Sequence, residues 1–170
     1  MNKMIILISI ICLLSCNTVE QSEQKDVFPI YNGSCINDYA NLISDETEAI
    51  IIEQCKNIYD EHIASIVVCT IDTIPKVRKE YNNIMIYATD LFNFWKIGRP
   101  GKNDGLLIFI SKKDRKVAFN TGYYLETVLH DSSLGRILDN NVIPYFKKEE
   151  WGEGILAGIE ECRKTILNNL

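Results

Sequence analysis

The segment from Trp95 to Glu126 constrains the fold more than any other part of the chain. It contains a polar, glycine-rich loop, an apolar run over residues 106–110, the pair Asp114 and Arg115, and a second polar turn. This order predicts a helix end, a loop, a β-hairpin and another turn. Because a hairpin returns the chain to the level at which it started, the two polar turns should meet at one edge of a sheet.

The sequence before the hairpin predicts an α/β sandwich. Ser44 can cap a helix that begins with acidic residues, and residues 63–71 form a nearly continuous apolar run, typical of a buried strand. Residues 80–96 carry apolar side chains at steps of three and four, which predicts one helix that ends near Gly98. Strand, helix and strand in succession imply a parallel pair, to which the hairpin adds an antiparallel strand. The sheet should therefore be mixed.

Two further helices are predicted in the C-terminal part of the chain. Asp131 or Ser132 can cap the first of them. Pro144 predicts a kink or an end near residues 140–144, because proline lacks the N–H that a helix interior needs. Apolar residues at helical spacing between Ile155 and Ile166 mark the second helix.

Residues 1–15 have the pattern of a signal peptide. Lys3 precedes an apolar run over residues 4–14 that is too short for a permanent membrane span, and Leu-Leu-Ser-Cys at its end resembles a lipobox. In this interpretation Cys16 is lipidated and becomes the first mature residue. Cys12 is the competing position, and an ordinary cleaved signal or an uncleaved anchor are the other interpretations. Lipidation would hold the protein on the inner or outer membrane of the cell envelope, outside the cytoplasm.

The remainder of the chain divides into a tether and one domain. Residues 16–29 are polar and charged, which predicts a flexible tether, and residues 30–170 are long enough for one domain with its own core. Without residues 1–15 the chain has 17 Lys and Arg (18 minus Lys3) against 23 Asp and Glu, a net charge of −6. This acidic balance argues against a nucleic-acid partner, since a phosphate backbone requires a basic surface.

Four cysteines follow Cys16, and none of them has the spacing of a zinc site. They are Cys35, Cys55, Cys69 and Cys162. An even number of cysteines in an oxidising compartment could form disulfides. Cys69 lies inside the apolar run 63–71 and is predicted to be a small core residue.

The acidic residues around the hairpin could hold a metal ion. If the turn centres on Lys113, Asp104 lies opposite Gly122 at the predicted sheet edge. Calcium prefers several oxygen ligands, and glycines at 101, 105 and 122 would let the backbone approach it. The candidate ligands are Asp104, Glu126, Asp131 and Asn103. The alternative is that these residues form ordinary turns and helix caps.

Three further residues could contribute to the site. Asp38 precedes the Ser44 cap by six positions, and an extended chain of that length spans up to roughly 20 Å, so Asp38 could turn back to the hairpin edge as another ligand. Its alternative role is an Asx turn that fixes its own segment. Arg136 and Arg115 are the cations expected near a phosphate, and solvation or a carboxylate partner is the other role of Arg115.

A family resemblance rests on motifs that follow one another in a fixed order. They are residues 37–42 with Ser44, the loop 95–105, residues 114–116, Gly122 with Glu126, Gly135 with Arg136, and residues 144–146 followed by 151–155. As an ordered set they resemble the TPM domain, a small α/β module of bacterial envelope proteins and of the thylakoid lumen. The resemblance implies a three-layer αβα sandwich on a four-stranded mixed sheet, and calcium binding. Some plant members are associated with acid phosphatase activity and photosystem repair.

Two functions remain open at this point. The sequence has no Cys with an Arg six residues later and no Asp-x-Asp pair, and His62 and His130 form no visible cluster, so a phosphatase would have to use water held by a metal. Our expectation is a membrane-anchored, calcium-binding, non-catalytic envelope module that contacts a partner protein. A weak metal-dependent acid phosphatase is the alternative.

Overall fold

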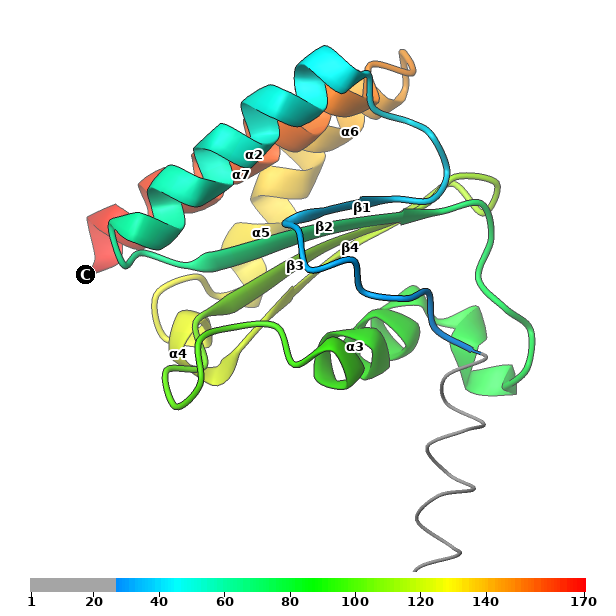
Figure 1. The fold of residues 1–170 in the computed structure, drawn as a ribbon, viewed down its shortest axis with the longest axis horizontal. Coiled ribbons are helices and arrows are strands. Elements are labelled where there is room, and N and C mark those ends of the chain that lie inside the picture. The colour runs from blue at the N-terminus through cyan, green and yellow to red at the C-terminus, as the bar shows by residue number, and fades with distance from the viewer. Residues whose placement is uncertain (1–26) are drawn as a thin grey trace, which may run out of the picture. The chain divides into compact units, whose positions relative to one another are not determined.

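A computed structural model describes residues 27–170, and residues 31–170 form one compact unit built on a four-stranded sheet (Figure 1). The strands, in chain order, are β1 (Ile36–Asp38), β2 (Ser65–Ile71), β3 (Gly105–Ser111) and β4 (Lys116–Thr121). They also lie side by side in this order, with β1, β2 and β3 parallel and β4 antiparallel to β3. Helices cover both sides of the sheet, so the predicted three-layer αβα sandwich with a mixed sheet is confirmed.

The hairpin of β3 and β4 differs from its predicted register by one residue. Leu106 pairs with Thr121. The next pair outward is Gly105 with Gly122, whose N–H donates to the Gly105 carbonyl over 2.8 Å. The predicted position of Asp104 opposite Gly122 is therefore wrong. The error matters because a shift of one residue turns a side chain to the opposite face of the sheet.

One face of the sheet is covered by α2 (Asp45–Asp60), α5 (Asp131–Ile137) and α7 (Trp151–Asn169) (Figure 1). Ser44 caps α2 as predicted, and its hydroxyl accepts a hydrogen bond from the Thr47 N–H over 3.3 Å. The buried side chains of α2 and α7 in this layer are Ile51, Cys55, Ile58, Ile155, Ile159, Cys162 and Ile166. Burial stabilises the fold by about 1.5–3 kcal/mol for each large aliphatic side chain, which makes this layer the main core.

The opposite face is covered by α3 (Ile84–Trp95), which packs against β3 and β4 (Figure 1). Tyr87 of this helix is fully buried, and its ring lies 5.1 Å from that of Phe109 on β3. Cys69 on β2 is also fully buried, which confirms the prediction that it belongs to the core.

The single helix predicted over residues 80–96 is wrong in its first turn. A short 3-10 helix, η1 (Lys79–Asn82), comes first, and Asn83 then adopts an extended conformation. The Asn83 side chain accepts from the Met85 N–H over 3.0 Å, so it caps α3 and separates the two elements. At the other end, Lys96 takes a left-handed conformation with φ 53° and ends α3 before Gly98 is reached.

The C-terminal helices contain an irregular turn where Pro144 predicted one. After α5 the chain forms a π-helix, η2 (Leu138–Val142), and then α6 (Ile143–Phe146), with the proline in its first turn. The proline prediction is thus confirmed. The predicted capping of α5 is wrong, because Asp131 is its first helical residue and the preceding His130 makes no side-chain hydrogen bond to the helix.

Residues 1–26 lie outside the described part of the chain. The predicted signal peptide (residues 1–15), the lipidation of Cys16 and most of the tether (residues 16–29) fall on them. Between residues 27 and 170, no helix combines the length and the apolar character needed to cross a membrane.

Candidate functional site

The predicted site centres on Asp104, which lies just before β3. This is the end of the sheet at which β2 and β3 begin and β4 ends, and it is called the Asp104 edge. The loop from Ile97 to Asp104 connects α3 to this strand. Although the neighbouring residues 101–103 are exposed, Asp104 is only 1% exposed. A buried carboxylate of this kind requires partners that compensate its charge.

Arg99 supplies that compensation from the same loop. Its guanidinium forms an ion pair with the Asp104 carboxylate, to which Nε donates over 2.5 Å. The backbone N–H of Arg99 donates to the other carboxylate oxygen over 2.8 Å. The side chains of the pair are only 11% and 2% exposed. Both oxygens of Asp104 are therefore already engaged by donors of its own loop.

The guanidinium of Arg99 also connects this loop to the end of α2. One of its terminal nitrogens lies 2.7 Å from Nδ1 of His62 and donates to the Tyr59 carbonyl over 3.5 Å. The guanidinium carbon lies 5.2 Å from the centre of the Tyr59 ring, which is the geometry of a cation–π contact. Sequence reasoning missed Arg99. Its signal was a cation five residues before a buried aspartate.

The predicted glycines at this edge serve close backbone packing. A Cβ atom on Gly105 would lie 2.4 Å from the Ile97 carbonyl oxygen, and one on Gly122 would lie 2.4 Å from the Asn103 carbonyl oxygen. Both approaches are shorter than any Cβ contact allows, so glycine is required where the loop crosses the two strands. The described backbone thus explains both glycines through packing of the loop.

Two of the other predicted ligands follow β4 on separate short helices. Glu126 is exposed at the end of α4 (Tyr123–Glu126), and Asp131 is exposed at the start of α5. Asn103 is also exposed, with φ 53°, and its carbonyl accepts from the Tyr124 N–H over 3.1 Å. Within residues 27–170, no three His, Cys, Asp or Glu side chains are grouped so that they could hold a metal ion.

Asp38 lies at the opposite end of the strands from Asp104. It pairs with Thr70 at the far end of β2, whereas Gly105 pairs with Ser65 at the beginning of that strand. Ser65 and Thr70 are separated by roughly 17 Å at the usual rise of a strand. The structure therefore does not bring Asp38 and Asp104 into one site.

The carboxylate of Asp38 fixes its own segment, which was the alternative role considered from the sequence. It accepts from the N–H groups of Leu42 and Ile43 over 2.8 and 2.9 Å, and from the Thr70 hydroxyl. This carboxylate orders the turn that leads into the Ser44 cap.

The two predicted phosphate-binding arginines lie on different elements. Arg115 is exposed in the hairpin turn with φ 52°, at the end of β4 that is remote from Gly122. Arg136 is exposed on α5, and its guanidinium donates to the Ser133 hydroxyl over 3.3 Å. The described contacts of these two residues do not join them to Asp104.

Asp114 in the hairpin turn is a second anchoring aspartate that sequence reasoning did not single out as a site. It accepts from the Ser111 hydroxyl over 2.6 Å, from the Ile74 N–H over 2.8 Å and from the Thr73 hydroxyl over 3.1 Å. These hydrogen bonds, that from Ser111 first, lower the pKa of Asp114 below its ordinary value. Asp114 thereby joins the hairpin to the loop that follows β2.

Comparison with known proteins agrees with this architecture and these motifs. The family profile described as TPM domain matches residues 36–165. The chain belongs to the TPM domain family. No curated protein matches it.

Solved structures of bacterial proteins resemble the TPM domain described above. The N-terminal domain of a protein from P. gingivalis, solved by NMR, is 28% identical with a TM-score of 0.68 and covers 80% of this chain and 83% of that one. The BA42 protein of Bizionia argentinensis is 17% identical with a TM-score of 0.63, covering 75% and 83%. The N-terminal domain of the cg2496 protein of Corynebacterium glutamicum is 15% identical with a TM-score of 0.59, covering 81% and 82%. The last two comparisons show a likeness of fold alone.

The described side chains do not fit a preformed calcium site. Calcium takes six to eight oxygen ligands, and the most buried candidate, Asp104, already neutralises the guanidinium of Arg99. A cation that bound to Asp104 would have to replace Arg99. The arrangement can therefore hold the edge of the TPM domain in one shape without a bound ion.

Proposed function

We propose that this TPM domain is a non-catalytic interaction module that is held on a membrane of the cell envelope and contacts another envelope protein. Lipidation of Cys16 would provide the membrane anchor, and residues 16–29 would provide the reach. The contact surface in this proposal is the edge formed by the loop 97–104 and by α4.

The observation that carries the proposal is a pair of exposed tyrosines on this edge. Tyr123 is 76% exposed and Tyr124 is 42% exposed, directly after Gly122 at the end of β4. Tyrosine is enriched at protein interfaces, because its ring covers a large area at a small cost in conformational entropy. The Tyr124 N–H donates to the Asn103 carbonyl, so the backbone that presents the two rings is held by the loop.

The ion pair behind the tyrosines supports a binding role over a catalytic one. A general base must lie within roughly 2.6–3.2 Å of the proton that it accepts, and Asp104 is buried beneath its own loop. Both oxygens of Asp104 are occupied by Arg99, which instead makes the loop a rigid support. Preorganised surfaces lose less conformational entropy when they bind a partner.

In this proposal calcium would not fill a preformed site but would modulate this edge by rearranging it. The candidate ligands are Asp104, Asn103, Glu126 and Asp131. Because Asp104 would have to exchange Arg99 for the ion, calcium binding would change the conformation of the loop and so the surface offered to a partner.

Site-specific crosslinking in intact cells tests the proposal. A photoreactive residue in place of Tyr123 should give one defined protein adduct. The same residue in place of Ile50, which is 53% exposed on α2, serves as the matched control and should give none. Failure at both positions, or equal adducts from both, would contradict an interface at this edge.

An aryl phosphate assay with and without calcium distinguishes the catalytic alternative from the proposed binding role. We expect no turnover by the full-length protein. Turnover that is lost in Asp104→Asn and in Glu126→Gln, but kept in Asp72→Asn at the opposite edge, would instead establish the metal-dependent phosphatase. Glu126→Gln keeps this comparison informative if the buried Asp104→Asn variant does not fold.

A further inference from the structure

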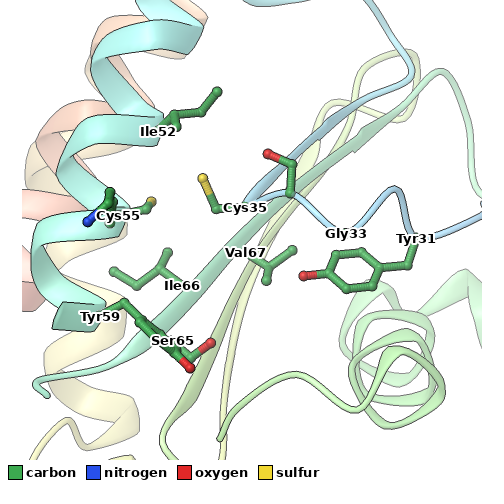
Figure 2. Close-up of a pocket in the computed structure, with 11 residues that line it drawn as sticks. Tyr31, Gly33, Cys35, Ile52, Cys55, Tyr59, Ser65, Ile66 and Val67 are labelled. Carbon is green, nitrogen blue, oxygen red and sulfur yellow. The ribbon is translucent and has the colours of Figure 1, made fainter.

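Two thiols face each other between the start of β1 and α2. Cys35 directly precedes β1, and Cys55 lies on the buried side of α2. Figure 2 shows the two sulfur atoms turned toward the space between these elements. The thiols are close enough to form a hydrogen bond, and neither is in a disulfide.

The sequence around Cys35 holds it firmly in this position. The Asn37 side chain accepts from the Asn32 N–H over 3.0 Å and donates to the Ser34 carbonyl over 3.1 Å. The carbonyl of Cys35 accepts from the Val68 N–H of β2 over 2.7 Å. The backbone of Cys35 is thus fixed by a turn on one side and by the sheet on the other.

The two thiols differ in acidity and in exposure, as do the attacking cysteine and the resolving cysteine of an exchange pair. A hydrogen bond from Cys55 lowers the pKa of Cys35, with a smaller contribution from Ser34 and with burial acting in the opposite direction. The same hydrogen bond, followed by burial, raises the pKa of Cys55. Cys35 is half-buried and Cys55 is only 3% exposed, so Cys35 is both the more accessible and the more easily ionised thiol.

A cavity of about 330 Å³ opens beside this pair. Both cysteines line it, together with Tyr31 and Tyr59 (Figure 2). Lys56 also lines it. Its volume lies at the small end of the range for ligand pockets, which suits the part of a disulfide next to the sulfur under attack. Cys69 and Cys162, in contrast, have no exposed surface, and burial raises their pKa above the ordinary value.

We propose that Cys35 and Cys55 form a thiol–disulfide exchange site, at which a small disulfide enters the cavity and is reduced while the two cysteines close into an internal disulfide. The two thiols belong to the start of β1 and to α2, whereas the proposed interface is the loop 97–104 with α4. Tyr59 lines the cavity and also contacts Arg99 of that loop, so the two sites are neighbours.

The exchange takes place in two balanced steps. Cys35 gives its proton to water, and its thiolate attacks one sulfur of the small disulfide, which forms a mixed disulfide and releases the other half as a thiolate. The Cys55 thiol then gives its proton to that thiolate, and its sulfur attacks Cys35, which expels the second half as a thiolate that takes a proton from water. The protein loses two electrons and two protons, and the small disulfide becomes two thiols.

Oxidation would fasten β1 to α2 and close the loop between residues 35 and 55. A crosslink of this length restricts the unfolded chain, which should raise Tm by roughly 6–12 °C. Reduction should reverse this rise.

Mass spectrometry of the full-length chain with Cys12→Ser and Cys16→Ser tests the proposal. Treatment of the folded protein with oxidised glutathione should remove two hydrogen atoms, leave no glutathione attached and give a crosslinked peptide pair containing Cys35 and Cys55. In Cys55→Ser, the same treatment should leave one glutathione on Cys35. Cys35→Ser should take up none.

The proposal requires that the remaining thiols of the folded protein do not react. Glutathione on Cys69 or Cys162 of the folded protein, or a crosslink that includes either, would overturn it. An unreactive Cys35 in a folded Cys55 variant would do the same. Cys55→Ala provides that variant if serine is not tolerated at the buried position, because alanine leaves no polar group without a partner.

Discussion

An aspartate lies away from solvent at each end of the strands. The donors that compensate its charge differ between the two ends, which are called the two edges. At one edge, Asp104 is paired with the guanidinium of Arg99. At the other edge, the half-buried Asp38 accepts hydrogen bonds only from neutral groups, namely two backbone N–H groups and the Thr70 hydroxyl. The carboxylate at the first edge is therefore neutralised in a buried ion pair, and the one at the second edge is stabilised by the hydrogen bonds of a backbone turn.

This difference determines what each edge tolerates. When one partner of a buried ion pair is lost, the other charge remains without compensation in a medium of low dielectric constant. When a carboxylate that is bound only by neutral donors is lost, no charge is left without a partner. The Asp104 edge should therefore be the more sensitive to mutation and the less available to an added ligand.

The largest effect is expected for Arg99→Met, which keeps an aliphatic chain but removes the guanidinium. The buried Asp104 carboxylate would lose its partner, and the free energy of unfolding should fall by about 3–5 kcal/mol. Urea unfolding measures this change. Arg136→Met removes an exposed arginine and should change stability by less than about 0.5 kcal/mol. Equal losses in both variants would show that the buried pair has no special role.

An intermediate effect is expected for Asp38→Ala at the opposite edge. The turn before α2 would lose three hydrogen bonds, and the free energy of unfolding should fall by about 2 kcal/mol. Asp38→Asn retains an acceptor oxygen and should lose less. Thermal unfolding of both variants beside Asp45→Ala, an exposed acidic residue in the first turn of α2, checks the order. A loss larger than that of Arg99→Met would reverse the comparison between the edges.

The smallest effect is expected for Asp114→Asn, and it should depend on pH. Because the folded pKa of Asp114 is lowered, its contribution is complete above the unfolded pKa and is lost as the pH falls through the folded pKa. The wild type should be more stable than the variant by about 1 kcal/mol at neutral pH. This advantage should shrink below about pH 4, the ordinary pKa of aspartate. Urea unfolding across that range provides the test, and a difference that stays constant with pH would contradict it.

The fold could be predicted because its signals are local. The apolar run that became β2, the Ser44 cap and the proline near residue 144 each act on neighbours within a few residues. The errors arose where a local pattern had two solutions. The stripe over residues 80–96 is compatible with one helix, and only the hydrogen bond from Met85 N–H to the Asn83 side chain shows where α3 begins.

The site was harder to predict because its contacts depend on how a loop folds and on which ends of the strands pair. Hairpin pairing correctly placed Asp104 and the glycines near the end of β4, but it could not reveal that Arg99 reaches back to occupy the carboxylate. The position of Asp38 depends on which end of β2 pairs with β1. The first fact leaves only a cation five residues before the aspartate as a signal, and the second leaves none.

The sequence by itself determined the class of fold, because the spacing of apolar residues and the order of turns predict an α/β sandwich with a mixed sheet. Its ordered motifs resembled the family that the profile then matched. The tertiary structure alone decided the partners of each charged or reactive side chain. Arg99 with Asp104, and Cys35 with Cys55, are pairs created by packing. The physical reason is that the energy of a charge or a thiol depends on the atoms within a few ångströms of it, and chain folding, not sequence distance, determines which atoms those are.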